Sequence, residues 1–144
     1  MEHVAIMKKS WGLTKKILDG RKKIESRWYK TKRKPWDSIK KGEKIYFKDS
    51  GEPVNLMAEV DKIIQFSGLT PKKVKEILEK HASADGIEKN KIPEFYERFK
   101  DSKYCILVFL KNPVEIRPFE INKAGFGIMS AWLTVESVKK IKKL

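Results

Sequence analysis

Short apolar runs recur along the chain, and several of them alternate with polar residues at every second position. Alternation with a period of two is typical of strands with one buried face. In segment 54–66 it places Leu56, Ala58 and Val60 on the inward face. The run at 104–110 is the most apolar, so we expect it to be the most central strand. The extended segments expected are 3–7, 23–28, 44–48, 54–66, 104–110, 114–116 and 128–133.

Other segments show helical spacing. Residues 11–18 predict a short helix with Leu13, Ile17 and Leu18 inward, and Gly20 suits its end because glycine readily adopts the left-handed conformation. A last helix is expected after Thr134–Ser137, with Val138 and Ile141 facing inward. Asn112-Pro113 is expected to turn the chain between two extended segments.

An insertion of two helices is expected between 66 and 104. Thr70-Pro71 reads as the cap and first turn of its first helix, which should stop before Asp85-Gly86. The apolar stripe of this helix is Val74, Ile77 and Leu78. The second helix covers 92–99 and starts at Pro93. Strands around one sheet with peripheral helices predict an α+β domain with a barrel-like sheet of five to six strands, spanning residues 1–144.

Composition narrows the class of protein. The chain has 144 residues, 40% of them hydrophobic, and no apolar run approaches the ~18 residues that cross a bilayer. The N-terminal residues do not resemble a secretion signal, and the single Cys105 reads as a small core residue, so we expect a cytoplasmic protein. His3 and His81 lie outside metal-ligand spacing, so no metal or other cofactor is expected.

The basic charge is concentrated in one part of the chain. Residues 8–48 hold 16 of the 33 Lys and Arg but only four acids, while the whole chain has a net charge of +14. Trp11, Trp28, Tyr29 and Trp36 lie in the same window. Cations interleaved with aromatic rings favour a polyanion that carries bases, whereas uniformly solvated lysines would be spread more evenly. Pro35 indicates a surface loop over 29–43, and its cations are Lys30, Lys32, Arg33, Lys34, Lys40 and Lys41.

The sequence Gly20-x-Lys22-x-x-Glu25-x-Arg27 is the strongest candidate for chemistry. In an extended chain Lys23, Glu25 and Arg27 share one face, and Lys22, Ile24 and Ser26 share the other. A carboxylate between two cations suits either an anion-reading surface or a solvated strand. Lys22, Glu25 and Arg27, with Asp85 as a partner, form the tightest set, and no Gly-rich phosphate loop or Gly-x-Ser-x-Gly elbow occurs.

This motif resembles the signature of ASCH domains, within the PUA-like superfamily. Residues 41–47, Lys-Gly-Glu-Lys-Ile-Tyr-Phe, are similar to the Lys-Gly-Asp strand entry of that family, and His81-Ala82-x-x-Asp85-Gly86 is similar to its Ala-x-x-Glu-Gly turn. The apolar run at 104–109 follows where the family has one. The resemblance implies a PUA-like β-barrel with a cleft beside the motif strand and a role in binding RNA.

The resemblance also implies an enzyme possibility. Some small ASCH proteins hydrolyse N4-acylated cytidine with the motif Lys, a Thr on the same strand and a Glu from the turn, and others cleave RNA. Lys22 matches the Lys, Asp85 stands one methylene short at the position of the Glu, and Glu25 replaces the Thr. The related EVE and YTH domains bind modified bases in aromatic cages, for which Trp11, Trp28 and Trp132 are candidates.

Two functions are therefore expected in this order. The first is an RNA-binding module, a monomer or weak dimer, that reads RNA or a modified nucleotide in a basic, Trp-lined cleft. The second is a small hydrolase or ribonuclease whose catalytic set is Lys22, Glu25 and Asp85. A basic face that meets an acidic protein is a third possibility. The predicted nucleic-acid-binding residues are Lys22, Lys23, Glu25, Arg27, Trp28, Lys32, Arg33, Lys34, Trp11 and Trp132.

Overall fold

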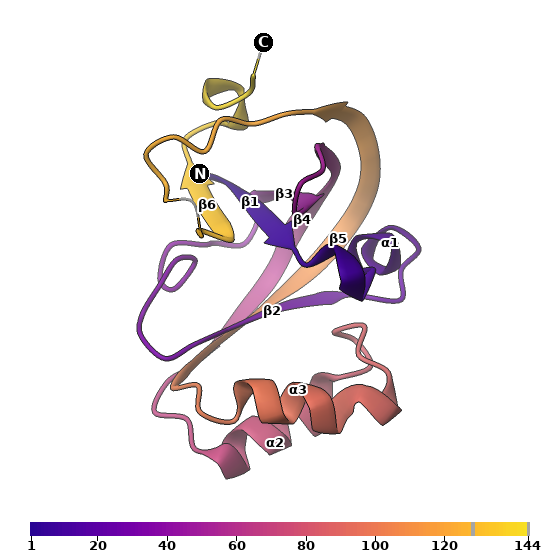
Figure 1. Cartoon of the computed structure of the whole chain (residues 1–144), viewed down its shortest axis with the longest axis vertical. Coiled ribbons are helices and arrows are strands. Elements are labelled where there is room, and N and C mark those ends of the chain that lie inside the picture. Colours follow the sequence, from indigo (N-terminus) through magenta and orange to yellow (C-terminus); the bar gives the residue numbers. More distant parts are fainter. Residues whose placement is uncertain (128, 144) are drawn as a thin grey trace.

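The computed structural model describes residues 1–127 and 129–143, which form one curled six-stranded sheet with helices at its ends (Figure 1). The strands are β1 (Glu2–Met7), β2 (Ile24–Tyr29), β3 (Lys44–Asp49), β4 (Val54–Phe66), β5 (Tyr104–Phe119) and β6 (Trp132–Val135). Their order in the sheet is β2-β5-β4-β3-β1-β6. β1 and β3 run parallel, and the other neighbouring strands run antiparallel. This mixed sheet curls into a half-barrel, with β2 and β6 as its two edges (Figure 1).

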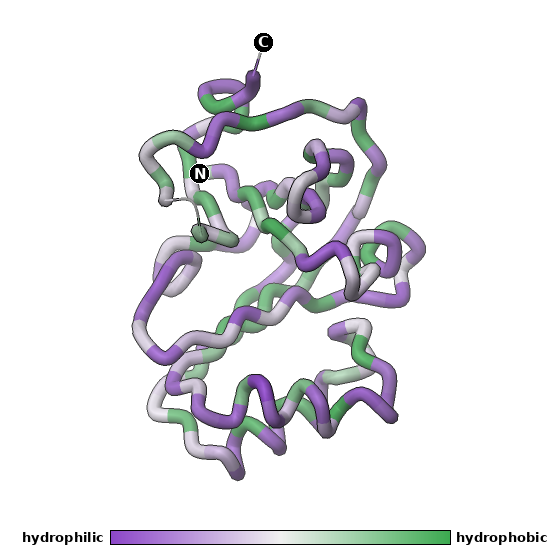
Figure 2. Tube along the Cα trace, viewed as in Figure 1, coloured by the Kyte–Doolittle hydropathy of each residue, from purple (hydrophilic) through white to green (hydrophobic). Residues whose placement is uncertain are grey.

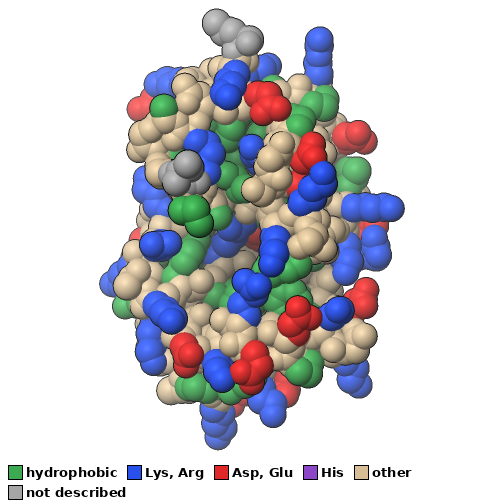
Figure 3. All heavy atoms as spheres, in the orientation of Figure 1, with side chains coloured by type: hydrophobic (Ala, Val, Ile, Leu, Met, Phe, Trp, Pro, Cys, Tyr) green, Lys and Arg blue, Asp and Glu red, His purple; other side chains and the backbone are tan. Residues whose placement is uncertain are grey.

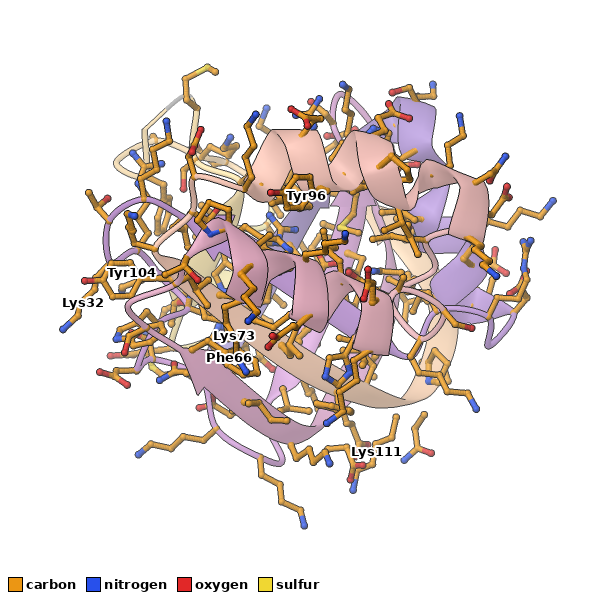
Figure 4. All side chains as sticks on the ribbon, turned by 90° about the horizontal axis from the view of Figure 1, so that it is seen from below. Lys32, Phe66, Lys73, Tyr96, Tyr104 and Lys111 are labelled. Atoms are coloured by element: carbon orange, nitrogen blue, oxygen red, sulfur yellow. The ribbon has the colours of Figure 1, made fainter. Side chains whose placement is uncertain are left out.

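The helices gather at two places. α1 (Leu13–Leu18) follows the short 3₁₀ helix η1 (Lys9–Trp11) beside the sheet. α2 (Pro71–His81) and α3 (Ile92–Phe99), joined through η2 (Lys89–Lys91), lie side by side across the lower end of the molecule (Figure 4). This arrangement confirms the predicted two-helix insertion. No helix within the described residues is long and apolar enough to cross a membrane.

The core has three parts: one inside the curled sheet, one between the sheet and the insertion, and one around Val4, Val54 and Leu133. Leu56, Ala58 and Val60 of β4 are fully or nearly fully buried, which confirms the alternation in the sequence. Val74, Ile77 and Leu78 of α2 pack with Ile24 and Leu107 of the sheet. Hydrophobic residues accordingly follow the strands and the inner sides of the helices, while the loop after β2 is mostly hydrophilic (Figure 2).

The cap of α2 forms as its sequence predicts. Thr70 Oγ1 accepts a hydrogen bond from the Lys73 backbone N–H at 3.3 Å, and Pro71 occupies the first turn. A proline there costs nothing because the first-turn N–H groups have no partner inside the helix. The cap therefore fixes where the chain leaves β4 and enters the insertion.

Two strand predictions are corrected by the pairing of β4 and β5. Asn112-Pro113 does not turn the chain, because β5 runs through both residues. Asn112 adopts a positive φ of 52° within the strand. The register shift between Met57 and Glu59 gives β5 an extra residue there, and such a bulge tolerates a proline that cannot donate. β5 also lies second in the sheet, between β2 and β4, rather than at its centre.

Both ends of the chain also differ from expectation. Residues 11–18 divide at Gly12 into η1 and α1, and Leu18 is 41% exposed because so short a helix buries only one narrow side. Thr134 and Val135 continue β6, which pairs with β1, and only one 3₁₀ turn, η3 (Val138–Lys140), follows. The expected strand 128–133 begins at a residue outside the described ones, and the strand itself starts at Trp132.

Candidate functional site

A cleft of about 360 Å³ opens between β2, the end of β1 and α3. Figure 3 shows this face hollowed above the helices, with Lys and Arg side chains gathered around the hollow. The cleft is lined by the motif residues Lys22, Glu25 and Arg27 and by the turn residue Asp85. These four residues, which we call the charge cluster, meet in the cleft, although Asp85 lies 63 positions from Lys22 in the sequence. The volume of the cleft lies within the range of about 300–1,000 Å³ that is usual for small-molecule sites.

Lys22 lies at the centre of the charge cluster and is only 2% exposed. Its Nζ donates to the Asp85 backbone oxygen at 2.7 Å and to Asp85 Oδ1 at 2.5 Å, and it lies 3.2 Å from Glu25 Oε1. An ammonium group has three N–H donors, so these three acceptors use all of them. Burial alone would lower the pKa of Lys22, but the Asp85 and Glu25 carboxylates outweigh it and raise the pKa above its ordinary value. Two carboxylates therefore hold the Lys22 ammonium in its charged form at the centre of the charge cluster.

Glu25 bridges Lys22 and Arg27. Its Oε2 accepts from Arg27 Nε at 3.0 Å and from the Arg27 NH2 group at 2.7 Å. Burial alone would raise the pKa of Glu25, but Arg27 and Lys22 hold the pKa below its usual range. The alternation predicted Lys23 as the partner of Glu25. That prediction is wrong because β2 begins only at Ile24, so the strand alternation does not extend back to Lys22 and Lys23. Lys22 turns inward to Glu25, and Lys23 is exposed.

Arg27 also joins the two edges of the half-barrel. β2 and β6 end the sheet without pairing with each other, and Arg27 spans this gap by donating to the Ile6 and Ala131 backbone oxygens at 3.3 Å each. Its guanidinium lies 5.2 Å from the ring centre of Trp132. Most Arg27 donors are consequently engaged within the protein, so this side chain shapes the cleft more than it offers charge to a ligand.

Asp85 is presented by the turn that follows α2. The Lys23 and Ile24 backbone N–H groups donate to the Ala84 oxygen at 2.6 and 2.9 Å, which ties this turn to the start of β2. Gly86 adopts a φ of 78°, and a Cβ there would lie 3.1 Å from Lys22 Cβ. The close approach of turn and lysine therefore requires glycine at this position.

Asp85 also brings a hydroxyl group into the cleft. Ser26 Oγ donates to Asp85 Oδ2 at 2.6 Å and accepts from Trp28 Nε1 at 3.0 Å. Burial raises the pKa of Asp85 despite the neighbouring Lys22. A carboxylate with a raised pKa is a stronger proton acceptor, so Asp85 can take the proton of the Ser26 hydroxyl that it binds. Ser26 was not predicted as a site residue, although the strand alternation placed it on the same face as Lys22.

Aromatic side chains form the walls of the cleft. Trp28 stacks on Phe99 with ring centres 5.0 Å apart and an interplanar angle of 8°. Trp11 meets Phe95 edge to face at 5.1 Å. All four rings line the cleft, and each is partly exposed. Phe95 and Phe99 lie on the apolar face of the amphipathic α3. From the sequence alone, such a face is expected to pack in the core, so it did not indicate a cleft wall.

Three further cations line the mouth of the cleft. Arg98 of α3 and Lys8 lie over the Trp11 ring at 5.0 and 5.3 Å from its centre, and Lys30 follows the end of β2. All three are exposed. Neither Arg98 nor Lys8 was predicted from the sequence as a binding residue. An exposed arginine on a helix carries no local signal that distinguishes it from a solvated one.

The remaining predicted binding residues lie elsewhere. Lys32, Arg33 and Lys34 are exposed in the loop after β2 and do not line the cleft. Lys23 points away from the charge cluster into a neighbouring groove. Trp132 is 5% exposed, and its Nε1 donates to His3 Nδ1 at 3.1 Å, so its indole supports Arg27 and offers no free face to a base. Of the three tryptophans expected to form an aromatic cage, Trp11 and Trp28 line the cleft with Phe95 and Phe99, and Trp132 does not.

Neither histidine nor the cysteine enters the cleft. His3 is fully buried between Thr134 and Glu43, and Cys105 lies in the core beneath the insertion. Within 1–127 and 129–143, no group of three or more His, Cys, Asp or Glu side chains could hold a metal ion. The chemistry of the site is therefore that of a lysine, an arginine, two carboxylates and a hydroxyl.

No family model and no curated protein match this sequence. The fold does match solved structures. The ASCH protein of Zymomonas mobilis superposes with a TM-score of 0.68 at 16% identity, over 96% of this chain and 90% of its own. The N-terminal domain of McrB from Staphylothermus marinus gives 0.51 at 15% identity, over 83% and 76% of the two chains. A protein of Enterococcus faecalis V583 gives 0.51 at 13%, over 72% and 68%. The chain therefore has the ASCH-type, PUA-like fold that its motif predicted.

Proposed function

We propose that this chain, built on the ASCH-type fold, binds single-stranded RNA by drawing one unstacked base into the cleft. The observation that carries the proposal is the combination of aromatic walls, a polar floor and cations at the mouth of one hollow. Single-stranded RNA is commonly recognised in this way, with splayed bases on aromatic rings and phosphates on basic side chains. The likeness to ASCH proteins supports the same choice.

The floor of the cleft suits a base better than a phosphate. The charge cluster combines two cations, Lys22 and Arg27, with two carboxylates, Glu25 and Asp85, so its net charge is zero. The donors of Lys22 are all used within the protein, and those of Arg27 nearly so. A phosphate would have to break these bonds, whereas a neutral base needs only polar edges and ring faces.

The phosphates belong at the mouth. Lys8, Lys30 and Arg98 are exposed and surround the entrance to the cleft. Arginine and lysine contacts to phosphate release bound counterions, which makes affinity fall as salt rises. In this arrangement the cluster selects the base and the mouth supplies much of the affinity.

The proposed role of the mouth in binding phosphate can be tested at Arg98, because the chain contains a matched control residue. Arg98→Ala removes a cation at the mouth, and Arg117→Ala removes another exposed arginine, which lies on β5 and outside the cleft. The measurement is fluorescence anisotropy of a labelled 12-nucleotide single-stranded RNA between 50 and 200 mM NaCl. We expect Arg98→Ala to weaken binding and reduce the log–log salt slope by about 0.7, the value for one phosphate contact on a single strand.

The control variant should retain the wild-type slope. Oligonucleotides with and without an N4-acetylated cytidine, compared in the same assay, show whether a modified base is preferred. Equal losses for Arg98→Ala and Arg117→Ala would mean that binding follows overall charge and that the cleft is not the site. An RNA affinity that hardly changes with salt would reject phosphate binding altogether.

A second function is favoured by the Ser26–Asp85 hydrogen bond. As a hydrolase of N4-acylated cytidine, Ser26 Oγ would attack the acyl carbon while its proton passes to Asp85 Oδ2. The amide C–N bond then breaks, the amine leaves with that proton, and water releases the acid from the serine ester. Ser26 thereby supplies the hydroxyl that is missing at Glu25, and Lys22 keeps Asp85 in place.

Hydrolysis of N4-acetylcytidine by wild type, Ser26→Ala and the exposed control Ser50→Ala tests this second function. We expect Ser26→Ala to lose activity by about 100-fold or more, and Ser50→Ala to retain it. Absence of turnover in the wild type, or equal turnover in all three proteins, removes the hydrolase and leaves the binding function untouched.

A further inference from the structure

A second hollow, which we call the groove, lies on the other side of the 84–86 turn from the cleft. It measures about 1,400 Å³ and runs between the end of α1, the end of α2 and the start of α3. Tyr96 on α3, labelled in Figure 4, lines it with Ile87, Ile92 and Pro93. The groove thus has an apolar base formed by the insertion, and Lys16 of α1 lines its other side.

Basic side chains surround this base. The groove is lined by six cations and two acids. The cations are Lys16, Arg21, Lys23, Lys75, Lys80 and Lys89, and the acids are Glu79 and Glu88. Three of these cations are already engaged: Lys16 donates to the Gly86 oxygen, Arg21 pairs with Asp19, and Lys75 lies 4.0 Å from Glu79. The rest are not.

Lys23, Lys80 and Lys89 are exposed and form no ion pair with any described residue. They come from three different segments, the start of β2, the end of α2 and η2, and meet around one hollow. Unpaired cations that line one hollow give it a positive potential, which favours the binding of an anion there. The groove therefore has the charge of a surface for a polyanion.

The groove and the cleft share one wall. Lys22 and Asp85 face the cleft, whereas their chain neighbours Lys23 and Gly86 face the groove, and Ile87 lines both. Hydrogen bonds from Lys16 Nζ to the Gly86 oxygen at 2.9 Å and from the start of β2 to Ala84 hold this wall together. A strand that leaves the cleft over the wall reaches the groove without crossing the rest of the protein.

We infer that the groove carries the phosphate backbone of the same RNA strand whose base enters the cleft, with Lys23, Lys80 and Lys89 as phosphate contacts. The inference rests on the proposed RNA binding and adds a second region to it. Lys23, which the sequence assigned to nucleic acid, thereby acts from the groove and not from the charge cluster. The binding site is then longer than one nucleotide, and affinity grows with the length of the strand.

The test compares two triple variants that lose the same charge. Lys23→Ala/Lys80→Ala/Lys89→Ala alters the groove, and Lys44→Ala/Lys103→Ala/Lys139→Ala removes three exposed lysines that line neither hollow. Binding of a mononucleotide, a trinucleotide and a 12-nucleotide single-stranded RNA is measured for each protein between 50 and 200 mM NaCl. Thermal unfolding of both variants verifies that they fold.

We expect the groove variant to bind the mononucleotide as wild type does, and to lose about 2 units of salt slope for the 12-nucleotide RNA, at about 0.7 per contact. The control triple should retain nearly all of that slope. Equal losses in the two triples, or an unchanged slope in the groove variant, would overturn the inference. Tight retention on heparin combined with no binding of any RNA would overturn it as well.

The same assay separates failure of the groove from failure of the cleft. If Arg98→Ala weakens every RNA while the groove variant behaves as wild type, the groove inference fails and the proposed function stands. If only the groove variant weakens the 12-nucleotide RNA and Arg98→Ala has no effect, RNA binding stands but the cleft is not its centre.

Discussion

Replacing Lys22 with methionine removes the central cation of the charge cluster while retaining most of the side-chain length. Glu25 and Asp85 then remain buried together, and among the described residues the one cation still paired with either is Arg27, which bonds Glu25. Removing one partner of a buried ion pair costs about 3–5 kcal/mol, because a charge is left without compensation. We expect Lys22→Met to lower the free energy of unfolding by this amount, which corresponds to about 6–20 °C in melting temperature for a chain of this size.

The loss should depend on pH. Without Lys22 the pKa values of Glu25 and Asp85 rise in the folded state, so one carboxyl stays protonated at low pH and the cost is smaller there. The deficit in unfolding free energy should therefore grow as pH rises from 5 to 8. Urea unfolding followed by tryptophan fluorescence at both pH values measures it.

Two further variants make the test specific. The exposed neighbour Lys23→Met should change stability by no more than about 0.5 kcal/mol. Lys22→Met combined with Asp85→Asn restores charge balance, so the double variant should recover part of the loss, as a coupled pair does. Wild-type stability in Lys22→Met, or a loss that neither pH nor Asp85→Asn alters, would refute the charge cluster as the support of the cleft.

Three other predictions follow from single positions. Gly86→Ala should destabilise more than Gly51→Ala, by about 1–3 kcal/mol in urea unfolding, because both positions have φ near 80° but only Gly86 faces Lys22; equal losses would contradict the close approach. Burial lowers the pKa of His3 below its ordinary 6.5, so the folded state gains stability above pH 6.5 and loses it as pH falls; His3→Gln should flatten the stability profile between pH 7 and 5, and an unchanged profile would refute this. Burial raises the pKa of the Cys105 thiol, so iodoacetamide should label it only after unfolding, and rapid labelling of the native protein would argue against its burial.

Local patterns predicted the secondary elements that are governed by local rules. The alternation of β4 and the Thr70-Pro71 start of α2 lie entirely within short stretches of chain, and both were read correctly from the sequence. The errors occur where a distant strand competes with local preference. Thr134 and Val135 suit a helix opening, but pairing with β1 draws them into β6.

The candidate site was only partly visible for a related reason. The motif strand and the turn at Asp85 could be found because family resemblance joined residues 63 positions apart. The role of Arg27 in spanning the gap to Ile6 and Ala131 depends on the curl of the sheet, which no local pattern encodes. Arg98 enters the site only because α3 packs beneath β2, so its exposure and charge alone gave no signal.

The four tryptophan indoles offer the most direct measurement of the central claim, that one base enters the cleft. Each indole N–H gives its own resonance in a ¹⁵N–¹H NMR spectrum, and single Trp→Phe variants assign them. As single-stranded RNA is added, entry of a base into the cleft should shift the Trp11 and Trp28 resonances saturably. The resonance of Trp36, which packs on Tyr104 outside the cleft, should stay unchanged. Shifts confined to Trp36, or none at Trp11 and Trp28 while RNA is bound, would contradict this claim.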